Sequence, residues 1–264
     1  MGRLFGLPPD FSAHGYQIDF LIILVHWVML LLFVGWAAFF AYALVRFRRK
    51  RNPVADYVGT QGRKSLFVEA GVALFEVVLL AAFAVPIWAK WITPPAASEN
   101  PVTVRVVAEQ FAWNVHYPGA DGVFGRTKPE LMGAANPLGL DTTDPAAQDD
   151  LTTINQLHMP VDRPMTVRLS SKDVIHSFSL NYLRVKQDAV PGMEIPVYFT
   201  ATETTPPESR LPACAPELTC WEIACAQLCG LGHFRMKGFY TVHSQEEFAA
   251  WLAAQTPFAK LGAS

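Results

Sequence analysis

Two features are absent from the 264-residue sequence, and each absence excludes a class of protein. The sequence has no Cys-x-x-Cys-His string, which attaches c-type haem, so no fused cytochrome c domain is expected. Charged side chains are absent from residues 20–45, and residues 66–89 contain only Glu69 and Glu76. A helix on the surface of a soluble protein carries a polar face, so two such stretches argue against a soluble protein.

Both weakly charged stretches are long enough to cross a membrane. A helix rises about 1.5 Å per residue, so about 20 residues span the hydrocarbon core of a bilayer. We therefore predict two membrane-spanning helices, over about residues 20–45 and 66–91, within a helical hairpin over residues 20–93. The connecting loop, 46–65, has one acidic residue, Asp56, and a basic loop of this kind stays cytoplasmic. Its basic residues are Arg46, Arg48, Arg49, Lys50, Arg51, Arg63 and Lys64.

This orientation predicts that the chain ends lie on the outer face of the membrane, which in a bacterium is the periplasm. The expected periplasmic parts are an N-terminal segment, 1–19, and a domain over 97–264. No signal peptide is expected, because residues 1–17 lack an apolar core. Residues 97–264 carry 18 acidic and 12 basic side chains. This acidity favours a basic partner, although ordinary solubilising charge explains it equally well.

After Pro95 the pattern changes from helical to extended. Val102, Val104 and Val106 alternate with polar residues, which indicates a half-buried strand. Short strands separated by turns suggest a Greek-key sandwich or barrel. Residues 118–151 are predicted to form a long loop with little regular structure. A C-terminal helix is predicted over 244–255, with Ser244 as its N-cap and Glu247 three residues later. Further strands are predicted over 164–170, 174–180, 195–201 and 238–243.

One short string contains a concentrated set of metal-binding side chains: Cys225-Ala-Gln-Leu-Cys229-Gly-Leu-Gly-His233-Phe-Arg-Met236. Two thiolates, an imidazole and a thioether are soft ligands, which favour copper over magnesium, calcium or manganese. Zinc also accepts Cys and His, but its sites seldom use methionine. A mononuclear blue-copper site uses one Cys, so a second thiolate would be surplus. Two thiolates that bridge two copper ions would use every donor.

A two-copper site needs a second imidazole, and the sequence offers several. His26 lies in the first predicted span and is set aside. His176 lies on a predicted strand about fifty residues before the cysteines, and a Greek-key fold could bring that strand beside the ligand string. From spacing alone His176 is one candidate among several.

Three motifs in order resemble one known family. Asp173-Val-Ile-His176-Ser-Phe, then Val185-Lys186-Gln-Asp188-Ala-Val-Pro-Gly192, and then the cysteine string are similar to the copper domain of cytochrome c oxidase subunit II. The resemblance implies a two-helix transmembrane hairpin followed by an all-β, cupredoxin-like Greek-key barrel that carries a binuclear CuA centre. It also implies the ligands: bridging Cys225 and Cys229, one imidazole each from His176 and His233, a weak ligand in Met236 and the backbone carbonyl of Gln227.

The resemblance further implies a role in respiration. The chain would accept electrons from a c-type cytochrome and pass them to haem in subunit I of a membrane complex, where oxygen is reduced to water and protons are translocated. The chain would then be an electron-transfer subunit of cytochrome c oxidase, with the oxygen-reducing site in its partner. Its expected partners are subunit I, further membrane subunits and the cytochrome, with no nucleic acid.

Four further positions are singled out by comparison with the family pattern. Gln227 stands where the family often has Glu, so a magnesium ion at the boundary with subunit I would be held weakly. Phe111 aligns with the family's electron-entry Trp and Trp113 with the next Trp, although packing alone explains Trp113 equally well. Glu69 resembles a glutamate at the mouth of a proton pathway, and Glu76, seven residues on, has no counterpart.

Two cysteines, Cys214 and Cys220, are left over after copper. In an oxidising periplasm they are predicted to form a disulfide.

Three other functions compete with the oxidase interpretation. A quinol oxidase subunit would share the fold but lack the copper ligands. A copper-bearing subunit of a nitric oxide reductase would use the same site with a different partner. A membrane-tethered copper-delivery protein would need to release its metal, which bridging thiolates with further donors oppose.

Overall fold

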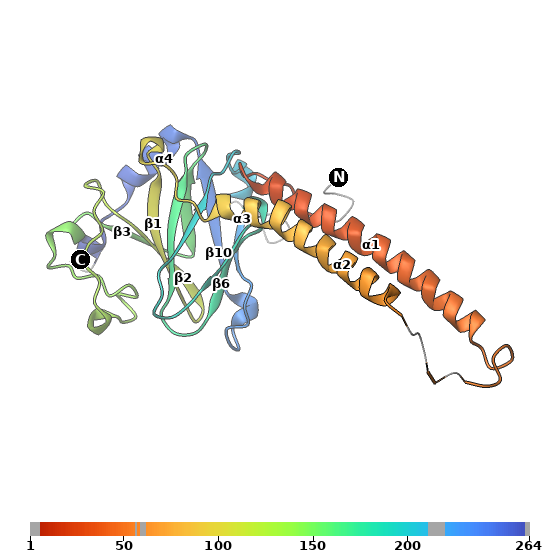
Figure 1. The fold of residues 1–264 in the computed structure, drawn as a ribbon. Helices are drawn as coiled ribbons and strands as arrows, with labels where there is room; N and C mark the ends of the chain where they lie inside the picture. Colours follow the sequence, from red (N-terminus) through yellow and green to blue (C-terminus); the bar gives the residue numbers. More distant parts are fainter. Residues whose placement is uncertain (1–5, 56, 59–61, 211–219, 262–264) are drawn as a thin grey trace. The chain divides into compact units, whose positions relative to one another are not determined.

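The structure is a computed structural model that describes residues 6–55, 57–58, 62–210 and 220–261. The chain forms two compact units (Figure 1). One unit is helical and includes residues 17–90. The other is built mainly of β-strands and includes residues 8–16 and 91–264. We call them the helical unit and the β unit.

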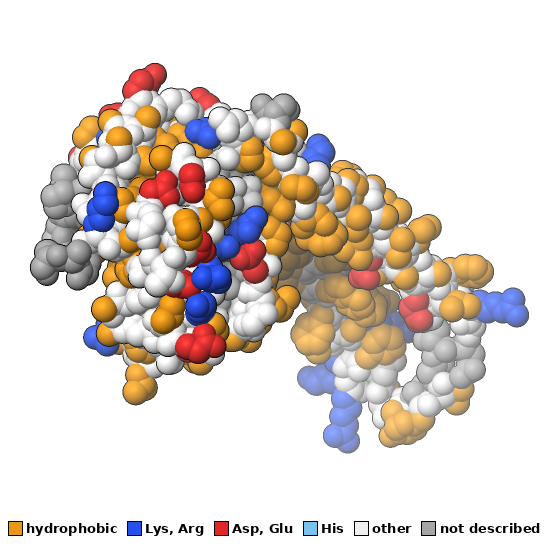
Figure 2. Space-filling model, turned by 90° about the vertical axis from the view of Figure 1, so that its left-hand side faces the viewer, with side chains coloured by type: hydrophobic (Ala, Val, Ile, Leu, Met, Phe, Trp, Pro, Cys, Tyr) orange, Lys and Arg blue, Asp and Glu red, His pale blue; other side chains and the backbone are white. Residues whose placement is uncertain are grey.

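The helical unit consists of two long apolar helices. Helix α1 spans Gly15–Arg46, and the second helix passes from α2 (Lys64–Leu79) through a π-helical segment (Leu80–Ala84) into α3 (Val85–Trp91). Both are long and apolar enough to cross a membrane, as predicted. Hydrophobic side chains cover the hairpin, while Lys and Arg gather at its loop end (Figure 2). The first helix begins at Gly15 rather than near Phe20.

Pro86 explains the π-helical segment before it. Proline has no backbone N–H, and in a regular helix its ring clashes with a carbonyl group one turn earlier. A wider turn relieves this clash. The Val85 amide accordingly donates to the Leu80 carbonyl, five residues back. The second helix therefore continues past the proline to Trp91.

The β unit contains two five-stranded sheets, in the orders β3-β2-β1-β5-β8 and β4-β10-β9-β6-β7. Most neighbouring strands are antiparallel, but β1 pairs with β5 and β4 with β10 in parallel. Strands distant in sequence thus become neighbours, as the predicted cupredoxin-like Greek-key fold requires. The strands are β1 Val102–Glu109, β2 Ala112–Tyr117, β3 Leu151–Ile154, β4 Gln156–Pro160, β5 Met165–Ser171, β6 His176–Leu180, β7 Val185–Ala189, β8 Ile195–Phe199, β9 Glu222–Cys225 and β10 Lys237–His243.

The core of the β unit is formed by buried side chains from both sheets. In β1 the predicted alternation is confirmed, because Val104 and Val106 are fully buried and their neighbours are partly exposed. Phe178 of β6 and Ile223 of β9 bury their side chains in the same cluster. The four other predicted strands correspond to β5, β6, β8 and β10. Strands β2, β3, β4, β7 and β9 were not predicted.

Residues 8–16 belong to the β unit, although the sequence suggested a separate N-terminal segment. The Phe11 amide donates to the Tyr182 carbonyl at 2.8 Å, and the Ala13 amide donates to the Thr200 carbonyl at 3.0 Å. The Phe11 ring stacks on Trp221 with 5.0 Å between ring centroids. The chain therefore contributes to the β unit both before α1 and after α3.

The long loop between β2 and β3 is anchored by a buried hydrogen bond between a histidine and a carboxylate. His116 and Asp150 are fully buried, and His116 Nε2 lies 2.8 Å from Asp150 Oδ2. The same carboxylate oxygen accepts a hydrogen bond from the Gly125 amide at 2.8 Å. This loop contains short 3-10 turns and one isolated β-bridge between Thr127 and Leu140, which fits the prediction of little regular structure.

The predicted C-terminal helix is α4, Gln245–Ala254, and its N-cap is confirmed. The Ser244 hydroxyl accepts a hydrogen bond from the Glu247 amide, and the Glu247 carboxylate accepts one from the Ser244 amide. This capping box gives hydrogen-bond acceptors to two backbone N–H groups that have no partner within the helix. A further short helix, α5 (Phe258–Leu261), was not predicted.

Helix α4 packs on β4 and β10 through a stack of aromatic rings. His158 Nδ1 lies 2.8 Å from His243 Nε2, and the His158 ring stacks on Trp251 with 4.0 Å between centroids. Burial, reinforced by His243, lowers the pKa of His158 to about 3. Burial and the Arg210 cation lower the pKa of His243, although Glu247 opposes this shift. Both rings are therefore neutral at pH 7.

We expect the β unit to lose stability as the pH falls below about 6.5, the pKa of an unfolded histidine. The unfolded chain then binds protons that folded His158 excludes, so this contribution is full above pH 6.5 and is lost progressively towards pH 3. The loss is at most about 1.4 kcal/mol per pH unit for one histidine. Unfolding of the detergent-solubilised chain between pH 7 and 5 measures it. His158→Phe should flatten the profile, and an unchanged profile in this variant would contradict the assignment.

Candidate metal centre

Two paired strands and the loop that follows them position the metal-binding side chains. His176 begins β6 and Cys225 ends β9, and these strands pair with Phe178 opposite Cys225. The Ala226 amide donates to the Ser177 carbonyl at 2.9 Å, which extends the pairing to the start of the loop. The loop then returns to β10, which begins at Lys237. The cysteine string is thus held between two strands of one sheet.

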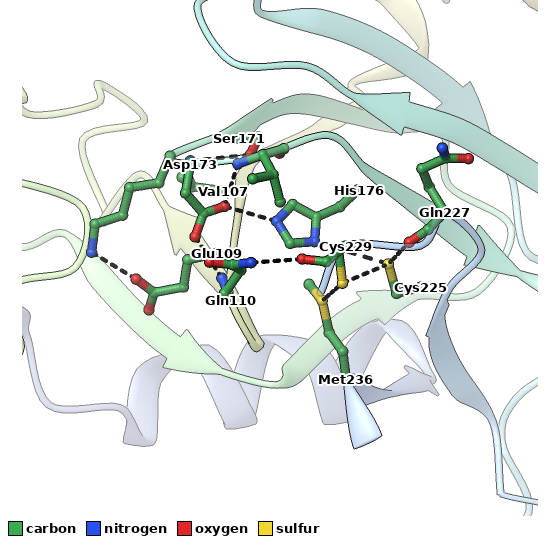
Figure 3. A network of polar contacts seen from close by, with 12 residues as sticks. Val107, Glu109, Gln110, Ser171, Asp173, His176, Cys225, Gln227, Cys229 and Met236 are labelled. Atoms are coloured by element: carbon green, nitrogen blue, oxygen red, sulfur yellow. Dashed lines mark hydrogen bonds and ion pairs between the residues drawn. The ribbon is translucent and has the colours of Figure 1, made fainter. Parts of the chain in front are cut away.

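The structure brings together all six side-chain or backbone donors predicted from the sequence. The sulfur atoms of Cys225 and Cys229 lie 3.8 Å apart. The ligand atoms of His176, Cys225 and Cys229 all lie within 4.8 Å of one another, so this group could hold a metal ion. Figure 3 shows both sulfurs beside the His176 ring. The other contacts are Cys225 Sγ to His176 Nδ1, 3.9 Å; Cys225 Sγ to the Gln227 carbonyl, 3.2 Å; Cys229 Sγ to His233 Nδ1, 3.6 Å; and Cys229 Sγ to Met236 Sδ, 3.7 Å.

The distance between the two sulfur atoms fits metal binding. A disulfide would place them about 2.05 Å apart. Two metal–sulfur bonds of about 2.3 Å to one tetrahedral ion require a separation of about 3.8 Å. The observed 3.8 Å matches this second value. Cys225 and Cys229 are therefore close enough to bind one metal ion together.

Burial makes the Cys229 thiol difficult to ionise without a cation. Cys229 is 4% exposed and Met236 is 1% exposed. Burial and the neighbouring Cys225 raise the pKa of the Cys229 thiol to about 11. Metal binding requires the thiolate, and a bound cation reverses this shift. The surroundings of Cys229 thus favour its thiolate only when positive charge is bound nearby.

Asp173 orients the His176 ring, a role that the sequence analysis did not assign. The Asp173 Oδ1 atom lies 2.9 Å from His176 Nε2, so this nitrogen donates and Nδ1 faces the Cys225 sulfur. Partial burial would raise the pKa of Asp173, but hydrogen bonds from His176 and from the Gln110 and Val174 amides outweigh it and lower the pKa. The position of Asp173, three residues before His176 in the resemblance motif, was the available signal.

The turn between β1 and β2 lies against the ligand loop. Gln110 Nε2 donates to the Cys229 carbonyl at 2.6 Å. The neighbouring Phe111 ring is half-buried, and the Arg235 guanidinium carbon lies 5.8 Å from its centroid. A Cβ atom at Gly232 would lie 2.4 Å from the Phe111 ring, so only glycine leaves room there. Phe111, the predicted entry residue, thus touches the ligand loop directly.

Trp113 lies in the core rather than at the surface. Its side chain is fully buried, and its ring is 5.5 Å from Phe178 and 6.3 Å from His176, centroid to centroid, in edge-on orientation. This placement favours the packing interpretation of Trp113.

The remaining predicted residues belong to the helical unit or to the predicted disulfide, which includes a cysteine outside the described residues. Glu69 lies on α2 and accepts a hydrogen bond from the Ser65 hydroxyl at 2.6 Å. Glu76 is exposed on the same helix. Cys214 lies outside the described residues, so the Cys214–Cys220 disulfide stays a prediction.

Comparison with known proteins identifies one kind of relative. The family described as cytochrome c oxidase subunit II, periplasmic domain, matches residues 102–205, a range that ends before the cysteine string. The alternative cytochrome c oxidase subunit 2 of Bradyrhizobium diazoefficiens is 30% identical over 254 residues, which cover 96% of this chain and 85% of that protein. Cytochrome c oxidase subunit 2 of Cereibacter sphaeroides is 28% identical over 261 residues, covering 94% and 78%. The chain is thus similar to such subunits along most of its length.

Proposed function

This chain belongs to the cytochrome c oxidase subunit II family, and we propose that it is the electron-accepting subunit of a respiratory haem–copper oxidase. Its β unit would hold two copper ions as a CuA centre, receive electrons from a c-type cytochrome and pass them to haem in a partner membrane subunit. That partner would reduce oxygen to water and couple the reaction to proton translocation. Cytochrome c oxidase activity is then a property of the complex.

The observation that carries this proposal is the placement of four further donors, in two groups, around one pair of sulfur atoms, which makes six donors in all. His176 Nδ1 and the Gln227 carbonyl lie near the Cys225 sulfur. His233 Nδ1 and Met236 Sδ lie near the Cys229 sulfur. One tetrahedral ion takes four ligands, so the set exceeds what a single ion needs. Two ions bridged by both thiolates would use all six donors.

Such a centre suits electron transfer. When bound, two copper ions bridged by thiolates would share one unpaired electron, so the charge on each ion would change little on reduction. The chain contributes rigidity, because His176, Cys229 and Met236 are buried and close-packed side chains do not rearrange easily. A small rearrangement on reduction favours fast electron transfer.

The same burial supports a resident metal centre rather than copper delivery. A delivery site must expose and release its metal, whereas Cys229 and Met236 are almost completely buried. A copper-bearing subunit of a nitric oxide reductase would have this same site. Identification of the haem subunit that copurifies with the chain distinguishes that alternative.

Phe111 is the residue that we propose for electron entry. It lies at the β1–β2 turn, partly exposed and in contact with the ligand loop. The exposed side chains of Leu228, Leu231 and Phe234 on that loop provide apolar surface nearby. In the helical unit, we propose that Glu69 lies on a proton pathway into the partner. A magnesium ion near Gln227 would be held weakly, because an amide is a poorer ligand than a carboxylate.

We propose that the β unit lies on the periplasmic side of a bacterial inner membrane. The basic loop between the two helices supports this orientation, because such loops stay in the cytoplasm. Residues 8–16 and 91–264 share one folded unit, so both ends of the hairpin lead to the same side.

Copper loading of the full-length chain tests the proposal. The purified chain in detergent is expected to bind two copper ions, to turn purple and to give a seven-line paramagnetic signal. These features arise when one unpaired electron is shared equally by two copper nuclei. One copper or zinc ion per chain, or a colourless Cu(I) protein, would overturn it.

A further inference from the structure

Gln110 contacts both sides of the candidate metal centre through two different groups. Its side-chain Nε2 donates to the Cys229 carbonyl at 2.6 Å, and its backbone amide donates to Asp173 Oδ2 at 2.7 Å. The other oxygen of Asp173 lies 2.9 Å from His176 Nε2. Figure 3 shows these contacts as one chain from Cys229 through Gln110 and Asp173 to His176.

From these contacts we infer that Gln110 is a positioning residue that fixes two copper ligands, Cys229 and His176, relative to each other. The inference rests on the proposed function, because it concerns the ligands of the same copper centre. Gln110 itself would not touch a metal ion. It would act through the Cys229 backbone on one side and through the Asp173 carboxylate on the other.

The chemistry of glutamine suits both contacts. Only the amide nitrogen of its side chain can donate to a carbonyl, so the orientation of the Gln110 amide is determined by the Cys229 oxygen. The ligand loop leaves space for this amide at Gly230. A Cβ atom there would lie 2.7 Å from Gln110 Nε2, and the positive φ of 136° also favours glycine.

The turn that carries Gln110 is held in place independently of the ligand loop. Lys172 Nζ forms an ion pair with Glu109 Oε2 at 2.6 Å, and Asn114 Nδ2 donates to Glu109 Oε1 at 3.0 Å. The Lys172 amide donates to the Ala108 carbonyl at 2.9 Å. The turn that carries Gln110 is therefore fixed by contacts of its own. Because Gln110 does not depend on the ligand loop for its position, it can restrain Cys229 and His176.

Carboxylates and carbonyls that support metal ligands typically account for roughly 10-fold to 100-fold in metal affinity. In Gln110→Ala the side-chain contact with Cys229 is lost, while the backbone contact with Asp173 remains. We expect copper affinity of the full-length chain to fall by roughly 10-fold or more, measured by competition with a copper chelator. The copper hyperfine splitting of the paramagnetic signal should also become unequal, because the two ions would no longer be held alike.

Two companion variants separate positioning from general damage to the turn. Gln110→Glu has nearly the same shape, but its carboxylate has no donor and would repel the Cys229 carbonyl, so it should lose at least as much copper affinity as Gln110→Ala. Glu109→Gln removes the charge that pairs with Lys172, but its side-chain oxygen can still accept from Asn114 and the Lys172 amide still donates to the Ala108 carbonyl. The turn therefore stays anchored with both contacts of Gln110 in place, and this variant should retain wild-type copper affinity and signal. Combining Gln110→Ala with Asp173→Asn should cost less than the sum of the separate losses, since both act on one linked pair of ligands.

The outcomes distinguish this inference from the proposed function. If the wild-type chain binds two copper ions and Gln110→Ala keeps wild-type affinity and splitting, the positioning role is wrong while the copper centre stands. Equal losses in Glu109→Gln and Gln110→Ala would also overturn it, because the turn as a whole would then be responsible. If the wild-type chain fails to bind two copper ions, the proposed function itself fails.

Discussion

Replacement of Cys229 by Ser is expected to abolish the two-copper centre and, with it, electron uptake by the chain. Serine is a hard donor with a far higher pKa than cysteine, so it cannot bridge two soft copper ions. Loss of a residue that only hydrogen-bonds to a metal ligand costs up to roughly 100-fold in metal affinity. Loss of a bridging ligand itself should cost more. Copper content and the visible and paramagnetic spectra of the purified full-length chain measure the effect.

Leu231→Ser is the matched control for this experiment. It introduces the same residue into the same loop, and the Leu231 side chain is 99% exposed and offers no metal ligand. It should keep both copper ions and the wild-type spectra. Cys225→Ser should behave like Cys229→Ser, because both sulfurs take part in the 3.8 Å pair. If Cys229→Ser keeps two copper ions and a seven-line signal, the bridging role of this sulfur is wrong.

Strands of the β unit could be predicted where one face is buried and the other exposed. Strand β1 shows this alternation in Val104 and Val106. Strand β2 was missed because both of its faces are covered. Trp113, Val115 and Tyr117 point into the core, while Asn114 and His116 are almost fully buried as well. Strand β9 has only four residues, too few to show a clear alternation of apolar and polar side chains.

The candidate site divides in the same way between local and distant contacts. The side-chain donors of Cys225, Cys229, His233 and Met236 could be predicted because they lie within one short string, where spacing in the sequence limits distance in space. The Gln227 carbonyl came only from the family resemblance. The choice of His176 depended on the family resemblance, since spacing left several histidines open. The role of Gln110 could not be predicted, because its contacts reach across 63 residues to Asp173 and 119 residues to Cys229. Only the pairing of strands brings these parts of the chain together.

Replacement of Trp113 by Ala is expected to lower the free energy of unfolding of the β unit by about 3–5 kcal/mol. The Trp113 side chain is fully buried between the sheets, against the edge of the Phe178 ring and beside His176. Its removal would leave a cavity that rigid neighbouring strands cannot close. Urea unfolding of the detergent-solubilised chain, followed by near-ultraviolet circular dichroism after copper is removed, measures this loss without the contribution of the metal.

Trp113→Phe distinguishes packing from a direct role in electron transfer. Among the described residues the indole Nε1 of Trp113 has no hydrogen-bond partner, so phenylalanine loses packing but no hydrogen bond. It should be less destabilising than alanine and should leave the rate of electron uptake by the copper-loaded chain near the wild-type value. Wild-type stability in Trp113→Ala would contradict the packing role. A large loss of electron uptake in Trp113→Phe, with copper content and stability intact, would instead make Trp113 part of the electron path, because only the indole would then have been removed from a centre that is otherwise complete.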